Sequence, residues 1–187
     1  MTTPFLAKPT LVGELVTLRP IQAEDADLLD RIIRDDNQIA RLTGSVHRSD
    51  EDPMVNLPIE QLREIYSGWA TAEDRLVLGV VDNAIGDLVG EVVLNEWDEG
   101  NRSCSFRTLI GAAGRGRGLG TEATRLTVEH GLRKMGLHRI SLEVYDFNPR
   151  ARHVYEKVGF VHEGTGRDAL LFDDAWIDVH YMAIIGN

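Results

Sequence analysis

The segment Gly114-Arg115-Gly116-Arg117-Gly118-Leu119-Gly120-Thr121 lies between an apolar run that ends at Ile110 and a helical pattern that extends to Met135. Glycines let a backbone approach a ligand closely, and the first N–H groups of a helix bind anions. The segment fits neither Gly-x-x-x-x-Gly-Lys-Ser/Thr nor Gly-x-Gly-x-x-Gly, so the common nucleotide loops are not indicated. It indicates an anion site between a strand and a helix, or otherwise a plain tight turn.

The elements around this turn are predicted from apolar periodicity and turn residues. Upstream, we expect a strand over Leu11–Pro20, helices over Ala23–Asp35 and Ile59–Ala72, and between these helices a loop with short helical pieces over residues 36–58. An antiparallel meander should follow, with strands over Leu76–Val81, Leu88–Leu94 and Ser103–Ile110. Downstream, we expect a helix, a strand, a helix and a final hairpin: Thr121–Met135, Arg139–Tyr145, Pro149–Val158 and the remaining residues. The order strand, helix, strand implies a parallel pair in a mostly antiparallel sheet, hence an α+β fold.

Length and composition indicate one globular domain over residues 1–187, with residues 1–10 expected to form a flexible N-terminal segment. With 43% hydrophobic residues the chain is not of the disordered class. No apolar run approaches the roughly 18 residues of a membrane span, and Met1-Thr2-Thr3-Pro4 does not begin a secretory signal. The single cysteine, Cys104, cannot form an internal disulfide, which favours a cytoplasmic protein.

The charge is unevenly distributed along the chain. The formal net charge is −10, yet residues 102–157 carry an excess of Lys and Arg between two acidic regions. An acidic protein is a poor nonspecific binder of nucleic acid, so no nucleic-acid partner is expected. The basic segment instead favours a small anionic ligand.

A second motif follows the predicted strand Arg139–Tyr145. In Asn148-Pro149-Arg150-Ala151-Arg152-His153-Val154-Tyr155, the asparagine suits a helix N-cap and the proline the first helical position. Tyr155 lies in the apolar stripe of that helix, and Gly159 ends it. Taken alone, this motif indicates only a short helix.

Together, the two motifs resemble the GCN5-related N-acetyltransferases (GNAT). The family pattern is Arg-Gly-x-Gly-x-Gly, then Asn-x-x-Ala-x-x-x-Tyr-x-x-x-Gly-Phe, and the resemblance covers about Leu11 to Ile184. The stretch Glu163–Ala169 is similar to the branch that includes bacterial ribosomal-protein N-terminal acetyltransferases. The resemblance implies the GNAT fold, with helices on both faces of the sheet and a parallel pair that splays between Ile110 and Tyr145. It also implies acetyl-coenzyme A as acetyl donor and no metal.

The resemblance also assigns roles to residues of this sequence. The turn would hold the pyrophosphate, the strand end would hydrogen-bond the pantetheine arm with help from Asn148, and Tyr155 would face the thiolate as the acid. The implied donor-binding residues are Leu109, Ile110, Arg115, Gly116, Arg117, Gly118, Leu119, Gly120, Thr121, Asn148 and Tyr155. Ala112 stands where the family usually has a proline, which leaves the phosphate contacts intact.

Amide formation requires a neutral amine, stabilisation of an oxyanion and a proton for the departing sulfur. A backbone N–H near Ile110 would stabilise the oxyanion, and the phenol of Tyr155 stays protonated at pH 7. The candidate bases are Glu143 and Glu91, either of which could act through a water. A carboxylate among apolar neighbours has a raised pKa that suits a base, or otherwise lies at a strand edge facing water as a structural residue.

The sequence therefore predicts an N-acetyltransferase that transfers acetyl directly in a ternary complex, first to a protein N-terminal α-amine. The alternatives are a detoxifying enzyme for a small amine (polyamine, aminoglycoside or amino-nucleotide) and a non-catalytic acetyl-coenzyme A sensor, against which the presence of Tyr155 argues. The acidic residues Asp50, Glu51, Asp52, Glu60 and Glu64 favour a cationic acceptor or are plain solvated surface. No membrane partner is expected, and a homodimer is left open.

Overall fold

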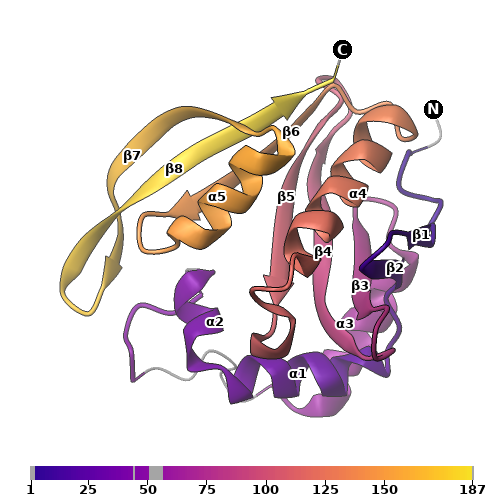
Figure 1. The fold of residues 1–187 in the computed structure, drawn as a ribbon, viewed down its shortest axis with the longest axis horizontal. Helices are drawn as coiled ribbons and strands as arrows, with labels where there is room; N and C mark the ends of the chain where they lie inside the picture. Colours follow the sequence, from indigo (N-terminus) through magenta and orange to yellow (C-terminus); the bar gives the residue numbers. More distant parts are fainter. Residues whose placement is uncertain (1–2, 44, 51–56, 187) are drawn as a thin grey trace.

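The computed structural model describes residues 3–43, 45–50 and 57–186. They form one eight-stranded sheet in the order β1-β2-β3-β4-β5-β6-β8-β7 (Figure 1). The strands are β1 Leu11–Val12, β2 Val16–Pro20, β3 Leu76–Asp82, β4 Leu88–Asp98, β5 Ser103–Ile110, β6 Arg139–Tyr145, β7 Val161–Phe172 and β8 Ala175–Ile185. The helices are α1 Asp25–Asp35, α2 Asn37–Leu42, α3 Ile59–Thr71, α4 Leu119–Arg133 and α5 Pro149–Val158, with a 3₁₀ turn at Ala112–Gly114.

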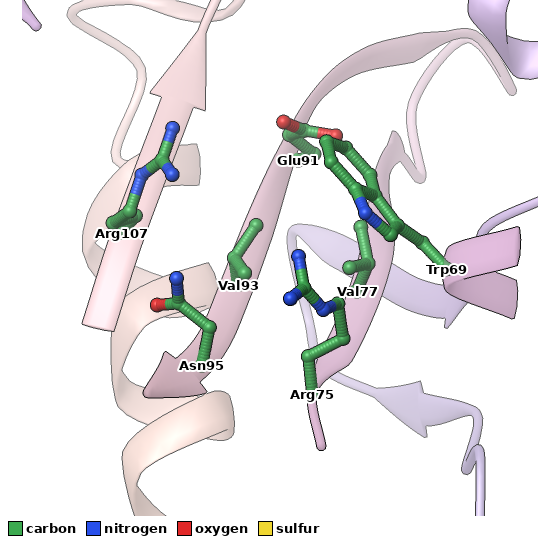
Figure 2. Close-up of a pocket in the computed structure, with 7 residues that line it drawn as sticks. All are labelled: Trp69, Arg75, Val77, Glu91, Val93, Asn95 and Arg107. Atoms are coloured by element: carbon green, nitrogen blue, oxygen red, sulfur yellow. The ribbon is translucent and has the colours of Figure 1, made fainter. Parts of the chain in front are cut away.

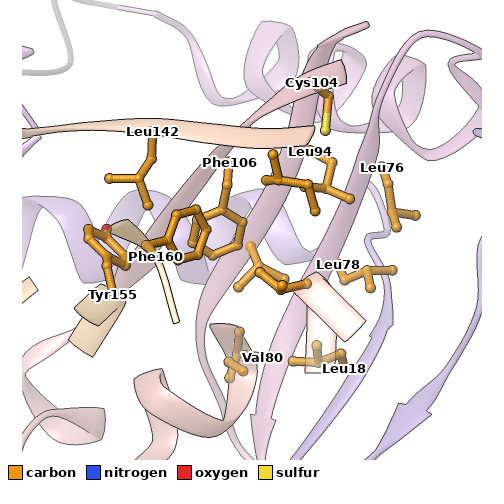
Figure 3. Close-up of a cluster of buried hydrophobic side chains, with 14 of the residues drawn as sticks. Leu18, Leu76, Leu78, Val80, Leu94, Cys104, Phe106, Leu142, Tyr155 and Phe160 are labelled. Atoms are coloured by element: carbon orange, nitrogen blue, oxygen red, sulfur yellow. The ribbon is translucent and has the colours of Figure 1, made fainter. Parts of the chain in front are cut away.

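Helices cover both faces of the sheet, because each strand points alternate side chains to opposite sides. Phe106, Ile140 and Leu142 face α4 and α5 in the larger core cluster, part of which is shown in Figure 3. Val77 and Val93 point to the other face, where they pack with residues of α1 and α3. The predicted α+β class with helices on both faces is confirmed.

The strand pair β5 and β6 is the feature of the sheet that positions the site. It is the one parallel pair in the described part of the chain, and its register covers only Ser103↔Arg139, Cys104↔Ile140 and Ser105↔Ser141. Beyond Ser105 the two strands are no longer paired, although β5 continues to Ile110 and β6 to Tyr145. The backbone groups on this side of residues 106–110 therefore lack a strand partner, as expected for a splayed pair.

One predicted strand differs from the structure. Leu11–Pro20 is two strands rather than one, because the chain turns at Gly13, whose N–H donates to the carbonyl of Val16 at 2.8 Å. The segment 36–58 contains the short helix α2, as the expected short helical pieces predict, and its N-cap Asp36 accepts a hydrogen bond from the N–H of Gln38. Residues 51–56, including Glu51 and Asp52 of the acidic group, lie outside the described residues.

The N-terminal segment is packed where it is described, unlike the flexible segment expected for residues 1–10. The Phe5 side chain is fully buried, and its ring meets the Trp97 ring edge-on at 5.6 Å between centroids. The Lys8 ammonium donates to the carbonyls of Ala72 and Arg75, both at 2.6 Å. Burial of one large aromatic ring is worth about 3 kcal/mol, which offsets the backbone entropy of ordering about two residues.

Glu122 in α4 holds the β1–β2 turn. Its carboxylate accepts backbone hydrogen bonds from Glu14, Leu15 and Val16 at 3.2, 2.6 and 2.9 Å. Helical periodicity places Glu122 in one band with the charged residues Arg125, Glu129 and Arg133, which predicts a solvated side chain, but that side chain is only 11% exposed. Burial acts to raise the pKa of Glu122, but the three amide donors outweigh it and the pKa lies below its ordinary value.

We expect Glu122→Ala to destabilise the protein by about 2 kcal/mol, because it leaves amide donors without their charged acceptor. Since the folded-state pKa is lowered, this stabilisation is present above the ordinary pKa of the group and is lost as the pH falls through the lowered value. Urea unfolding at pH 7 and at pH 4 measures both effects. Glu129→Ala, on the exposed side of the same helix, is the control and should change stability by less than about 0.5 kcal/mol. Equal stabilities of the two variants would contradict the role of Glu122.

Candidate active site

The glycine-rich turn presents the N-terminus of α4 as an anion site. Gly116 and Gly118 have φ angles of 74° and 85°, in the left-handed region that favours glycine. The first hydrogen bond of the helix runs from the N–H of Glu122 to the carbonyl of Gly118 at 3.1 Å. The N–H groups of Leu119, Gly120 and Thr121 precede that bond and have no acceptor within the helix. These residues fit a diphosphate, which accepts hydrogen bonds from such groups.

Both arginines of the turn are already paired with carboxylates. The guanidinium of Arg115 lies 2.6 Å from the carboxylate of Asp36, and its Nε donates to the carbonyl of Ile110 at 2.9 Å. Arg117 pairs with Asp82, a carboxylate that is 1% exposed. Hydrogen bonds from the Ala84 amide and from Arg117 hold the pKa of Asp82 below its usual range. The backbone N–H groups are therefore the available donors of this turn, and direct phosphate contacts by the two arginines stay a prediction.

Leu109 and Ile110 lie at the end of β5, on the unpaired part of the splayed pair. The neighbouring strand β4 approaches very closely here: a Cβ on Gly90 would lie 1.9 Å from the carbonyl oxygen of Leu109. No side chain fits between the two strands at this point, so Gly90 fixes where β5 ends. The other edge of these residues, toward β6, is the place where a pantetheine arm would find backbone donors and acceptors.

Tyr155 reaches this region from α5, on the α4/α5 face of the sheet. Its side chain is 7% exposed, and its ring packs edge-on against Phe106 of β5 at 6.2 Å between centroids (Figure 3). Burial raises the pKa of Tyr155 to about 12, so the phenol keeps its proton over the whole neutral range. Its hydroxyl has no hydrogen-bond partner among the residues that the structure describes.

Asn148 caps α5, as the sequence predicts. Its Oδ1 accepts from the N–H of Ala151 at 3.2 Å, and its Nδ2 donates to the carbonyl of Leu42 at 3.3 Å. The second bond joins α5 to the end of α2. Both polar atoms of the Asn148 side chain therefore already have a partner within the protein. A contact of Asn148 with the pantetheine arm stays a prediction.

The two candidate bases differ in environment. Glu143 is exposed on β6, opposite Tyr181 of β8. Glu91 is 9% exposed on β4, and its Oε2 is buried without a hydrogen-bond partner among the described residues. Burial raises the pKa of Glu91 to about 7, although a hydrogen bond from Tyr66 and the charge of Arg107 act to lower it. A base whose pKa lies near the working pH is the more effective, so the structure favours Glu91.

Glu91 lines a small pocket on the α1/α3 face of the sheet that is partly open to solvent (Figure 2). The pocket is lined by Trp69 of α3, by Arg75 and Val77 at the start of β3, by Glu91, Val93 and Asn95 of β4, and by Arg107 of β5. In the sheet register Glu91 stands opposite Leu109, and Val93 opposite Arg107. The pocket therefore flanks the strand that forms one side of the splay.

The site brings together Glu91, Leu109, Ile110 and the turn, with Tyr155 on the opposite face of β5. Sequence reasoning missed Trp69, Asn95 and Arg107. Arg107 carried a signal, since a charged residue in the otherwise uncharged run Ser103–Ile110 is unusual for a central strand. Trp69 carried none, because its place depends on how α3 crosses the sheet. Within residues 3–43, 45–50 and 57–186 no cluster of His, Cys, Asp and Glu suited to a metal was found, and no helix there is long and apolar enough to cross a membrane.

A splayed parallel pair beside a helix N-terminus that fits a diphosphate is typical of an acyltransferase that uses a coenzyme A thioester. The chain belongs to the GNAT family: residues 16–161 match the model of the acetyltransferase (GNAT) domain. It is therefore an N-acetyltransferase with acetyl-coenzyme A as donor, as the sequence predicts.

Known proteins similar to this chain have different acceptors in their names. The spermidine N(1)-acetyltransferase of Vibrio cholerae is 31% identical over 128 residues, which are 67% of this chain and 72% of that protein. The putative ribosomal N-acetyltransferase YdaF of Bacillus subtilis is 26% identical over 176 residues, 93% of each chain. The structure of Mycobacterium smegmatis RimJ in complex with CoA-disulfide superimposes with a TM-score of 0.80 and 26% identity, covering 99% of this chain and 90% of that one.

Proposed function

We propose that this N-acetyltransferase acetylates the α-amine at a protein N-terminus by direct transfer in a ternary complex. One observation carries the proposal: the two proton-transferring groups flank β5 from opposite faces, Glu91 on the α1/α3 side and Tyr155 on the α4/α5 side. Addition of an amine to a carbonyl and elimination of a thiolate require a base beside the amine and an acid beside the sulfur, and Glu91 and Tyr155 supply these two groups.

The residues then have the following roles. Acetyl-coenzyme A supplies the acetyl group as a thioester. The N–H groups of Leu119, Gly120 and Thr121 hold the diphosphate, and β5 beyond Ser105 orients the arm and offers an N–H to the oxyanion. Glu91 takes a proton from the amine, and Tyr155 gives one to the departing sulfur. The proton balance is closed when Glu91 and Tyr155 exchange protons with solvent.

The state of Cys104 supports direct transfer over a covalent acetyl-cysteine. Its thiol is buried in β5, and burial raises its pKa to about 12. The nucleophile in thiol chemistry is the thiolate, of which about one part in 10⁵ is present at pH 7 with such a pKa. An acetyl-enzyme on this residue is therefore disfavoured.

A small polyamine is the second candidate acceptor, favoured by the 31% identity to a spermidine N(1)-acetyltransferase. An N-terminal α-amine, with a pKa near ~8, is easier to deprotonate than an alkylamine with a pKa near ~10.4. The likeness to YdaF and RimJ along nearly the whole chain supports the first candidate. The cytoplasmic location stays a prediction.

Release of free thiol from acetyl-coenzyme A tests the proposal. We expect turnover with peptides that carry a free N-terminus and none with the same peptides after N-terminal blocking, since a blocked amine is not a nucleophile. Calorimetry with acetyl-coenzyme A alone confirms that the donor binds. Turnover of spermidine without turnover of any peptide would overturn the first candidate in favour of the second.

A further inference from the structure

Arg107 is a cation without a described partner at the edge of the Glu91 pocket. Arg107 is exposed on β5, and its side chain makes no hydrogen bond or ion pair with any of the described residues. Arg75, the other arginine of the pocket, differs: it pairs with Asp74 through two bonds of 3.1 and 3.0 Å and lies over the Trp69 ring at 5.6 Å. The charge of Arg75 is therefore satisfied, whereas that of Arg107 is available to a ligand.

Two buried acceptors in the same pocket also lack partners. Glu91 Oε2 and Asn95 Oδ1 are buried atoms without a hydrogen bond among the described residues. They lie on one strand, two positions on either side of Val93, and so point to the same face of the sheet. Leaving buried acceptors unpaired is costly, which indicates that a donor group belongs beside them.

The pocket thus offers two acceptors for a donor and one guanidinium for an anion or carbonyl oxygen. In Figure 2 the Arg107 guanidinium and the Glu91 carboxylate both lie toward the same side of the pocket. The two residues act on each other electrostatically, and they stand on adjacent strands one side-chain step apart. Diagonal neighbours of this kind lie about 7–8 Å apart, so one amino-acid unit fits between them with its amine toward Glu91 and its carbonyl oxygen toward Arg107.

We propose that Arg107 selects the acceptor by binding the carbonyl or carboxylate oxygen next to the reacting α-amine, while Glu91 accepts a hydrogen bond from that amine. This inference rests on the proposed function and deepens it: the substrate class is an α-amino-acid unit, from a peptide N-terminus or a free amino acid. A polyamine lacks the oxygen and would bring a second ammonium toward the Arg107 guanidinium, which repels it.

The test compares acceptors that carry a carbonyl or carboxylate oxygen next to the α-amine with amines that lack this oxygen. Wild type, Arg107→Gln and the control Arg125→Gln, an exposed arginine of α4, are assayed by thiol release with an alanyl peptide, alanine, ethylamine and spermidine. In the wild type we expect kcat/KM, expressed per neutral amine because ethylamine has the higher pKa, to be at least about tenfold higher for the peptide than for ethylamine. Arg107→Gln should lower the value for the peptide or alanine by about 10- to 100-fold more than the value for ethylamine, which shares only the effect of the lost charge on Glu91, while Arg125→Gln leaves all four unchanged.

Binding gives a second measure that needs no turnover. Calorimetric titration of the alanyl peptide into the coenzyme A-loaded protein should show a Kd raised by a similar factor in Arg107→Gln, with the affinity for coenzyme A unchanged. Turnover of the peptide alone identifies a protein N-terminus as the source, and turnover of alanine as well identifies a free amino acid.

The possible failures are distinguishable. If ethylamine and spermidine are turned over as well as the peptide, and Arg107→Gln affects none of them, the inference about Arg107 is wrong and the acetyltransferase assignment stands. If acetyl-coenzyme A binds but no amine releases thiol, the proposed function fails, and the inference fails with it.

Discussion

Replacing Tyr155 by phenylalanine should lower kcat for acetyl transfer by about 10³-fold while leaving the affinity for acetyl-coenzyme A unchanged. The ring contacts with Phe106 and Phe160 are kept, since phenylalanine retains the ring. What is lost is the hydroxyl, whose proton meets the charge on the departing sulfur, and general acid catalysis contributes about 10²- to 10⁴-fold. Because burial raises the pKa of Tyr155 to about 12, the rate should not fall between pH 7 and 10 through loss of this proton.

Single-turnover rates and calorimetry on the same preparations provide the measurement. Tyr181→Phe, at a residue of β8 that is 41% exposed, is the matched control and should keep the wild-type rate. Equal rates for wild type and Tyr155→Phe would remove Tyr155 from the mechanism and leave it a core residue.

Replacing Glu91 by glutamine should lower kcat by about 10²-fold and remove a step from its pH dependence. The base must be ionised, so the wild-type kcat should rise with pH through about 7, the pKa of Glu91. An α-amine contributes its own step near ~8, which both proteins share. The step near 7 should be absent from Glu91→Gln, and its persistence would show that another group is the base.

Stability separates this loss from unfolding. The folded-state pKa of Glu91 is raised by burial, so the folded protein loses stability as the pH rises from the ordinary value of the group to about 7, by roughly 3 kcal/mol. Glutamine carries no charge and avoids that loss. The variant should therefore be at least as stable as the wild type at pH 8, as measured by urea unfolding. Glu143→Gln decides between the two candidate bases: if it abolishes the step near 7 and Glu91→Gln does not, Glu143 is the base.

The glycine-rich turn shows how much of the site is local in the sequence. A run with Gly116 and Gly118 before an amphipathic helix predicts exposed N–H groups, because both the left-handed φ angles and the helix start depend on residues within the turn itself. The same holds for Asn148 and Pro149 at the start of α5 and for Gly159 at its end. These features were predicted correctly because each is fixed by neighbours within a few positions.

Partners that come from distant parts of the chain could not be predicted in this way. The sequence shows no carboxylate partner for Arg115 or Arg117 within the turn. In the structure they form ion pairs with Asp36 and Asp82, which belong to other parts of the chain. Glu122 looked solvated, but the β1–β2 turn folds onto it. Periodicity predicts which face of a helix or strand a residue occupies. It does not predict which other part of the chain packs on that face.

The sequence by itself determined the order of the elements, the mixed α+β sheet, the helix N-terminus that suits a diphosphate and the tyrosine at the family position. Only the tertiary structure decided that Glu91 rather than Glu143 is the buried carboxylate, and that Asn95 and Arg107 complete its pocket. The physical reason is that burial and charge depend on the sum of all neighbours in space. α3 covers Glu91, and the register of β4 with β5 brings Arg107 beside it, and neither contact is encoded in the spacing of residues along one segment.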